Sequence, residues 1–291
     1  MNRTKLRTFA QLMALLVLIA SCGSGEQKKK IKIGYTNWAD CIAITYLTKN
    51  VLTDQGYDVE LLNADAAPIY ASISTKKIDV FMDMWIPVTH KDYMDQYGDK
   101  LEVLGTVYDD ARIGLVVPEY VTINSIEELN VHKDRFDSNI IGIDAGSGIM
   151  KVTDQAIPGY GLDFNLLTSS GPAMTASLKR AIDEEKWMVV TGWTPHWMFE
   201  RFKLKMLEDP KGIYGTAESI QSVAWNGFSE KDPFVAELIG NIRLSSDEIG
   251  SLMAALEGSK TTEDKTVREW MKAHASLVES WIPVAAQAVN E

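Results

Sequence analysis

The chain has 291 residues, of which 46% are hydrophobic and 24% are charged. This composition is typical of a soluble globular protein, and it excludes a collagen, a disordered chain and a multispanning membrane protein. Lysines and arginines number 29 against 40 aspartates and glutamates, which gives a net charge of -11. Nonspecific binding of nucleic acid needs a cationic surface, so the acidic balance argues against that class of function.

Residues 1–21 have the pattern of an export signal. A positively charged start precedes the mostly apolar residues 9–20, which are too few to span a bilayer as a helix but have the length of a signal-peptide core. Ala20 and Ser21 before Cys22 resemble a lipobox, which implies cleavage before Cys22 and attachment of lipid to it. A plain secretory signal with an unmodified Cys22 is the alternative.

Residues 22–30 (CGSGEQKKK) are predicted to be a lipidated tether. We therefore expect a protein of the cell envelope, exported and held on a bacterial membrane, at its periplasmic or extracellular face, by the lipid anchor alone. If Cys22 is lipidated, Cys41 is the one remaining thiol and no intrachain disulfide can form.

After the tether, the pattern alternates between strands and helices. Strands are predicted at 31–35, 57–62 and 79–84, with helices at 40–52 and 67–77 between them. This β-α-β-α-β order favours a mostly parallel sheet with helices on both faces.

The same order recurs about one hundred residues later. Strands are predicted at 140–143, 162–167 and 187–190, with helices at 148–157 and 172–184. Local residues recur as well, because Trp-Ile-Pro at 85–87 parallels Trp-Thr-Pro at 193–195. We interpret the two copies as two similar α/β lobes.

The connections complete the predicted organisation. A strongly β-like stretch at 111–118 carries the chain from one lobe to the other, and a return crossing is expected near 204–215. Lobe 1 then comprises 31–110 plus 213–291, and lobe 2 comprises 111–212. Two lobes joined by two crossing strands form a hinged cleft suited to a ligand.

The C-terminal part is predicted to be helical from residue 218 onward. Amphipathic segments occur at 233–241, 246–257 and 263–276. Ser125 to Glu128 has the spacing of a capping box, which predicts a further helix start.

Catalytic and metal-binding motifs are sparse. The chain contains no His-Glu-x-x-His, no phosphate-binding Gly-x-x-x-x-Gly-Lys and no Gly-x-Ser-x-Gly. The histidines lack the close spacing of metal ligands, so we expect no metal, no cofactor and no enzyme. The alternative is an exported enzyme with Cys41 as nucleophile at a helix N-terminus, against which stands the simpler interpretation of Cys41 as a packed residue.

Three tryptophans occupy comparable places in the two copies. Trp38 follows the first strand, Trp85 ends the third strand, and Trp193 ends the equivalent strand of the second copy. Ligands bind at the carboxyl ends of parallel strands, so the three indoles are candidates for one aromatic pocket, with ordinary core packing as the alternative. Such a cage suits a quaternary ammonium, which has no N–H group and is attracted to aromatic faces.

A glycine-rich turn at 144–150 lies between a strand and a helix. Free amides at a helix N-terminus bind anions, although a simple tight turn explains Gly148 equally well. His90 could donate a hydrogen bond to the same anion or be an ordinary solvated loop histidine. A carboxylate at one end and a quaternary ammonium at the other describe a betaine.

Several stretches together resemble the substrate-binding lipoproteins of glycine betaine/proline betaine ABC transporters. They are IGYTNW at 33–38, ITYLTKN at 44–50, DMWIPVTH at 83–90, IGIDAGSGIM at 141–150 and TGWTPHWM at 191–198. The resemblance implies a type II periplasmic-binding-protein-like α/β fold with the ligand in the cleft. It also implies a cage of Trp38, Trp85 and Trp193, and carboxylate contacts from His90 and from the amides of Gly148 and Ile149.

The predicted function is therefore binding of glycine betaine, or of a related osmolyte such as proline betaine, for osmoprotection. The resemblance implies delivery to an ABC permease driven by a separate ATPase. A choline or carnitine binding protein is the alternative, and choline, which lacks a carboxylate, would need neither His90 nor the turn at Gly148. A sensor that signals in its closed state fits the same sequence.

Overall fold

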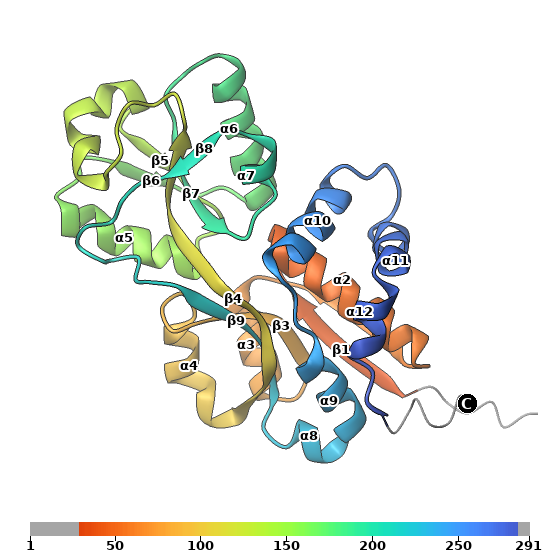
Figure 1. Cartoon of the computed structure of the whole chain (residues 1–291). Coiled ribbons are helices and arrows are strands. Elements are labelled where there is room, and N and C mark those ends of the chain that lie inside the picture. The colour runs from red at the N-terminus through yellow and green to blue at the C-terminus, as the bar shows by residue number, and fades with distance from the viewer. Residues whose placement is uncertain (1–28, 285–291) are drawn as a thin grey trace, which may run out of the picture.

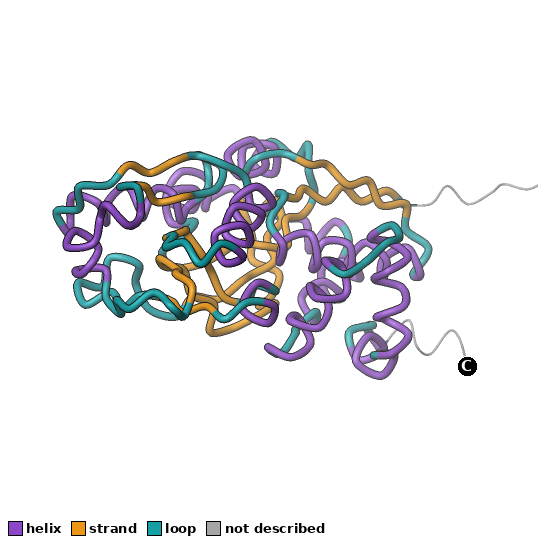
Figure 2. Tube along the Cα trace, turned by 90° about the horizontal axis from the view of Figure 1, so that it is seen from above, coloured by secondary structure: helices purple, strands orange, loops and turns teal. Residues whose placement is uncertain are grey.

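Strands form the interior of two α/β lobes, and helices cover them on the outside (Figures 1 and 2). The computed structural model describes residues 29–284. The predicted signal peptide, Cys22 and most of the predicted tether lie outside the described residues.

The first lobe begins with the β-α-β-α-β unit expected from the sequence. β1 (Lys30–Tyr35) pairs in parallel with β2 (Asp58–Asn63) and β3 (Val80–Ile86). α2 (Ala39–Asp54) and α3 (Ala66–Ser74) connect these strands, which confirms the predicted elements. Alternate residues of β1 and one face of α2 are buried, so the pattern that predicted the elements also forms the core between them.

The prediction that the chain is helical from residue 218 is wrong at its start. β9 (Glu218–Trp225) inserts between β3 and β4 (Leu101–Pro118) and is antiparallel to both. A central strand is buried on both faces, so its apolar residues do not alternate cleanly and resemble a buried helix. The sheets are consequently mixed rather than mostly parallel.

β4 belongs to both lobes. Its first part, as far as Ala111, pairs with β9, and Arg112 to Val116 pair with β7 (Val189–Thr194) of the second lobe. β8 (Leu204–Met206) pairs with the end of β4, so the chain returns to the first lobe after residue 206. Figure 1 shows β4 and β9 side by side between the lobes. The division at residues 110 and 213 stays a prediction.

The second lobe repeats the parallel arrangement of the first. β5 (Asn139–Ile141) lies between β6 (Asn165–Leu167) and β7, parallel to both. α5 (Gly148–Tyr160) and α6 (Gly171–Asp183) connect these strands, as predicted. The full strand order is β2-β1-β3-β9-β4-β7-β5-β6, with β8 added on β4.

The remaining elements are short or lie near the C-terminus. Ser125 forms the predicted capping box, but the helix that it starts is a 3₁₀ helix, η2. The predicted segments at 233–241, 246–257 and 263–276 correspond to α9, α10 and α11, and α4 was not predicted. These elements are α4 (Lys91–Tyr97), η1 (Gly98–Lys100), η2 (Ile126–Phe136), α7 (Met198–Arg201), α8 (Phe228–Lys231), α9 (Pro233–Asn241), α10 (Ser246–Glu257), α11 (Glu263–Ala273) and α12 (Ala275–Ser280).

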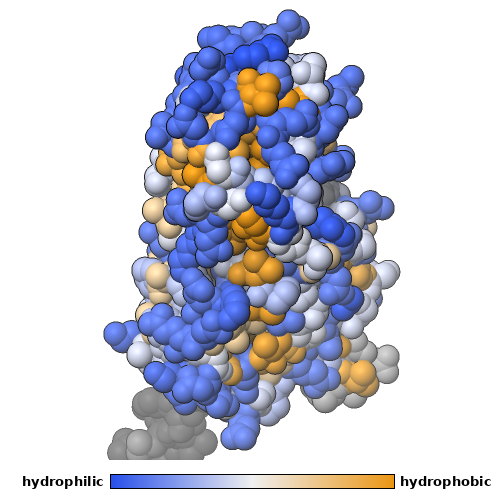
Figure 3. All heavy atoms as spheres, turned by 90° about the vertical axis from the view of Figure 1, so that its left-hand side faces the viewer, coloured by the Kyte–Doolittle hydropathy of each residue, from blue (hydrophilic) through white to orange (hydrophobic). Residues whose placement is uncertain are grey.

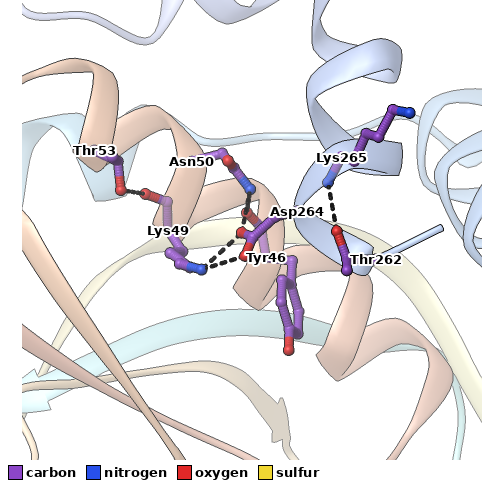
Figure 4. Close-up of polar contacts among 7 residues, drawn as sticks. All are labelled: Tyr46, Lys49, Asn50, Thr53, Thr262, Asp264 and Lys265. Atoms are coloured by element: carbon purple, nitrogen blue, oxygen red, sulfur yellow. Dashed lines mark hydrogen bonds and ion pairs between the residues drawn. The ribbon is translucent and has the colours of Figure 1, made fainter.

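α10 and α11 pack on α2 and support it from outside. Figure 4 shows Lys49 and Asn50 of α2 pointing toward Asp264 in the first turn of α11. The Nζ of Lys49 lies 2.6 Å from Oδ2 of Asp264, and the Nδ2 of Asn50 donates to Oδ1 at 3.1 Å. The C-terminal helices therefore help to fix the helix whose N-terminus faces the second lobe.

Hydrophilic residues cover most of the face shown in Figure 3, and hydrophobic residues form small groups on it. Within residues 29–284, no helix combines the length and apolar character needed to cross a membrane. The same residues contain no group of three or more histidine, cysteine or acidic side chains placed to hold a metal ion.

Candidate functional site

A cavity of about 300 Å³ lies where the two lobes meet. All six residues that the sequence predicted for ligand binding line it, together with five others. The lining residues are Trp38, Asp40, Trp85, Thr89, His90, Ile113, Ile143, Ser147, Gly148, Ile149 and Trp193.

The three tryptophans come from both lobes. Trp38 immediately precedes α2, Trp85 lies near the end of β3, and Trp193 lies near the end of β7. Each is buried, with an exposed fraction of 3% to 6%, yet each presents a surface to the cavity. Each tryptophan is thus packed in the buried core and also borders the cavity.

Two of the indoles are held by carboxyl groups of the opposite lobe. Trp38 Nε1 donates to Oδ1 of Asp144 at 2.9 Å, and Trp193 Nε1 donates to Oδ1 of Asp40 at 3.0 Å. Each bond crosses the cleft, one in each direction. These bonds fix the indoles only when the lobes are together.

The third indole is held within its own strand. Trp85 Nε1 donates to Oδ1 of Asp83 at 2.9 Å. Residues two apart in a strand lie on the same face, so Asp83 is placed beside Trp85 by the strand itself. This wall of the cavity is set within the first lobe.

His90 is fully buried, so the interpretation of a solvated loop histidine is wrong. Its Nδ1 accepts the backbone N–H of Trp85 at 2.9 Å, which assigns the ring proton to Nε2 in the neutral tautomer. Burial, and then the positive charge of Lys151, lower the pKa of His90 to about 3. His90 Nε2 has no hydrogen-bond partner among the described residues, so a neutral N–H donor without an acceptor borders the cavity.

The glycine-rich turn brings backbone amides to the same cavity. Gly148 and Ile149 are the first residues of α5, where amides have no acceptor within the helix. The hydroxyl of Ser147 does not cap them, because it donates to the carbonyl oxygen of Asp144 at 2.9 Å. A Cβ at position 148 would lie 1.9 Å from the carbonyl oxygen of Thr89. Only glycine allows the two lobes to come this close here.

Contacts at the rim show that the lobes are closed on each other. Tyr93 donates its hydroxyl to the carbonyl oxygen of Gly146 at 2.8 Å. Lys151 and Asp92 form an ion pair at 3.2 Å across the same cleft. The cavity is therefore a space between two surfaces in contact, and opening of the lobes would expose it.

Comparison with known proteins agrees with this architecture. Residues 29–273 match the family model described as the substrate binding domain of ABC-type glycine betaine transport system. The chain belongs to this family. A glycine betaine/carnitine transport binding protein, GbuC of Listeria monocytogenes, is 38% identical over 151 residues. That match covers 51% of this chain and 50% of GbuC, so the chain spans about half the length of this curated relative.

Solved structures of related substrate-binding domains have the same two-lobed fold. Lactococcal OpuAC in its closed-liganded conformation with glycine betaine has a TM-score of 0.84 and 31% identity, covering 88% of this chain and 100% of that one. ProX from Borrelia burgdorferi has a TM-score of 0.85 and 35% identity, covering 88% and 97%. An ABC-transporter choline binding protein, at 23% identity and a TM-score of 0.81, shares the fold. The type II α/β architecture expected from the sequence is thus confirmed.

Four acidic residues of this substrate-binding domain were not predicted for the site. Asp40, Asp83 and Asp144 accept the three indole N–H groups. Glu218 accepts the amides of Val88 at 2.7 Å and of the next residue at 2.9 Å, and so holds the loop before His90. Asp83 lies two residues before Trp85 in a strand, which is a signal in the sequence, whereas the contacts of Asp40, Asp144 and Glu218 depend on the tertiary fold.

Cys41 is buried behind the site and does not line the cavity. Its Sγ accepts the amide of Thr36 at 3.3 Å. Burial, and then the neighbouring Asp83 charge, raise the pKa of the Cys41 thiol well above its usual value. A protonated, inaccessible thiol is a poor nucleophile, so the packed-residue interpretation fits the structure.

Proposed function

We propose that the chain binds glycine betaine, or a betaine of similar size, and delivers it to an ABC importer. The observation that carries this proposal is the unpartnered Nε2–H of buried His90 in a cavity walled by three indoles. A buried donor without an acceptor costs free energy, and a ligand that supplies the acceptor recovers it. The site thus favours a ligand with an acceptor at one end and an apolar cation at the other.

The acceptor end of the ligand is a carboxylate. The amides of Gly148 and Ile149 begin a helix of 13 residues, where the helix dipole favours negative charge. His90 Nε2–H adds a donor from the opposite lobe. A carboxylate held by all three groups connects the lobes and stabilises their closed arrangement.

The cationic end of the ligand is a quaternary ammonium within Trp38, Trp85 and Trp193. Each aromatic wall contributes about 0.5–2 kcal/mol when the cation is desolvated, and each charge-assisted hydrogen bond contributes about 1.5–3 kcal/mol. After the costs of association and closure, a Kd on the order of micromolar results. The fold and the glycine betaine in the related lactococcal structure support the same assignment.

Binding followed by closure is the whole proposed activity, with no covalent step. The permease and its separate ATPase are the proposed partners, since the family is that of ABC-type transport systems. The proposal includes export, removal of residues 1–21 and lipid attachment at Cys22. Mass spectrometry of the membrane-bound protein tests this part, because an acylated N-terminal Cys22 supports it and an unmodified Cys22 contradicts it.

Calorimetric titration of residues 23–291 with glycine betaine tests the ligand, with choline and proline as comparisons. We expect a Kd on the order of micromolar for glycine betaine and much weaker binding of choline. Equal or tighter binding of choline would keep the aromatic cage and contradict the carboxylate assignment. The absence of heat with all three ligands, in a folded sample measured at two temperatures, would contradict the proposal.

A further inference from the structure

Two buried carboxyl groups lie together behind the indole walls. Asp40 and Asp83 are 1% and 0% exposed, and the charge of Asp40 helps to raise the pKa of Asp83. The Oδ1 atoms accept the indole N–H groups of Trp193 and Trp85. The Oδ2 atoms of both residues are buried and have no hydrogen-bond partner among the described residues. Two neighbouring buried carboxyl groups do not both stay charged, so we expect the pair to hold one proton.

The two carboxyl groups have different surroundings. We infer from these surroundings that Asp83 holds the proton. Asp40 lies in the first turn of α2, where the amides of Asp40 and Cys41 have no acceptor within the helix. Those amides and the helix dipole favour a negative charge on Asp40. Asp83 lies in the middle of β3 without such a helix end. Burial, and then the neighbouring Asp40, raise the pKa of Asp83 well above its usual value.

We propose that Asp40 and Asp83 form a carboxylate–carboxylic acid pair that carries one negative charge behind the cage and makes the site selective for a cationic head group. Asp40 is the charged member and lines the cavity. Asp83 is a positioning residue, which holds the proton and orients Trp85. The inference rests on the proposed betaine ligand and adds a second source of attraction for its cation.

No protein cation neutralises this charge within residues 29–284. None of the ion pairs in that part of the chain includes Asp40 or Asp83. Around the cavity, Asp144 accepts the Trp38 indole, and the charge of Lys151 acts on His90. The titratable side chains next to the pair are Cys41, Tyr70 and His90. Burial raises the pKa of the thiol and of the phenol, and lowers that of His90 to about 3, so all three are neutral at pH 7. A buried charge without a counterion is costly, and a ligand cation in the adjacent cavity compensates it.

A pair of ligands with the same shape and different charge tests the proposal. Glycine betaine and 3,3-dimethylbutanoate differ in the exchange of a quaternary nitrogen for carbon, and both keep the carboxylate. We expect Asp40→Asn to reduce the ratio of their affinities by tenfold or more, because the variant loses the charge. Asp83→Asn is expected to weaken both ligands by a similar factor, with the ratio within about threefold of wild type, since an amide replaces the neutral acid.

Asp79→Asn is the matched control. Asp79 also accepts an indole N–H, that of Trp225 at 3.1 Å, but it does not line the cavity. An unchanged ratio in Asp40→Asn would overturn the proposal. The proposal also predicts that Asp83→Asn lowers the ratio of the two ligand affinities less than Asp40→Asn does. Equal falls in this ratio would overturn the proposal, because the charge would then not reside on Asp40. Absence of betaine binding by the wild type would instead contradict the proposed function.

Two measurements on the wild-type protein complete the test and need no variant of Asp40. The ligand-free protein at neutral pH should show the infrared carbonyl band of a protonated carboxyl group, and Asp83→Asn should lack it. Burial raises the pKa of Asp40 to about 6, so betaine affinity should fall by up to about tenfold between pH 7 and pH 5 as Asp40 gains a proton. A missing infrared band, or an affinity that does not change over this range, would overturn the proposal.

Discussion

The two lobes share a Trp-x-Pro segment, but they hold the indole of that segment in different ways. In the first lobe, Asp83 lies two residues before Trp85 and accepts its indole N–H. In the second lobe, the corresponding residue before Trp193 is Thr191, whose buried hydroxyl has no hydrogen-bond partner among the described residues. Trp193 instead donates across the cleft to Asp40. The Trp-x-Pro segment of the first lobe thus orients its own indole, whereas the equivalent segment of the second lobe depends on a residue of the other lobe.

This difference separates a preassembled part of the site from a part that forms on closure. His90 and Trp85 are fixed to each other within the first lobe by the 2.9 Å bond from the Trp85 amide to Nδ1. Trp38 and Trp193 obtain their acceptors only from the opposite lobe. We expect the first part to provide initial contacts with ligand and the second to determine how firmly the closed state holds it.

Gly148→Ala is the change expected to break the closure-dependent part most severely. The added Cβ would lie 1.9 Å from the carbonyl oxygen of Thr89, and a backbone atom cannot move away as easily as a flexible side chain. We expect glycine betaine affinity to fall by at least about a hundredfold while the protein stays folded. Calorimetry measures the affinity, and small-angle scattering of the variant with saturating betaine measures the failure to close.

The control for that experiment is Gly146→Ala, since nothing lies within 4 Å of a Cβ built at Gly146. This variant should bind betaine within about threefold of wild type. Wild-type affinity in Gly148→Ala would mean that the lobes need not approach this closely to hold the ligand.

Trp193→Ala and Trp85→Ala compare the two kinds of indole directly. Both remove a wall of the cage, which should weaken betaine binding by tenfold or more. Trp193→Ala also removes the bond to Asp40 across the cleft, so we expect it to be about threefold to tenfold worse than Trp85→Ala. Titration calorimetry gives both affinities, and circular dichroism checks that each variant is folded. A greater loss in Trp85→Ala would contradict the division into preassembled and closure-dependent parts.

Much of the fold could be predicted because the two β-α-β-α-β units follow local patterns. The period of β1 and the helical pattern of α2 are visible within a few residues. β9 could not be predicted in the same way, since its burial on both faces comes from insertion between β3 and β4. The two lobes were therefore recognisable, whereas the antiparallel strand that completes the first sheet was not.

In the candidate site as well, features that follow from local sequence could be predicted, whereas contacts that depend on the tertiary structure could not. Trp38, Trp85 and Trp193 could be predicted to converge because they lie at equivalent ends of strands. The partners of Trp38 and Trp193 are 106 and 153 residues away in the sequence. No local pattern reports such pairs, since they depend on how the lobes close.

His90→Ala tests the preassembled part through its hydrogen bond to the carboxylate. We expect glycine betaine affinity to fall by about tenfold, and choline affinity to stay within about threefold, because choline has no carboxylate. The buried imidazole has a pKa of about 3, well below its unfolded value. The neutral form is thus present throughout pH 5 to 8. Only as pH falls through the folded pKa does a proton occupy Nδ1, which then no longer accepts the Trp85 amide, while Nε2–H still donates.

Titration calorimetry with both ligands at two pH values provides the measurement for His90. His132→Ala is a suitable control, because His132 lies in η2 of the second lobe and does not line the cavity. Equal losses for betaine and choline in His90→Ala would show that the imidazole acts through packing against Trp38 and not through the carboxylate.

Asp264→Ala is expected to have the smallest effect, and it asks whether the preassembled lobe needs its outer support. Asp264 holds Lys49 and Asn50 of α2 (Figure 4), but its side chain is 40% exposed. Partly exposed pairs of this kind contribute about 0.2–1 kcal/mol to the free energy of unfolding. The buried apolar face of α2 fixes the helix more strongly, so betaine affinity should stay within about twofold of wild type. Urea unfolding and calorimetry, with Lys265→Ala as the control whose side chain points away in Figure 4, measure the two quantities. A tenfold loss of affinity would instead mean that α11 determines the position of α2, and with it the positions of Trp38 and Asp40. The arrangement of the site in the first lobe would then depend on the C-terminal helices.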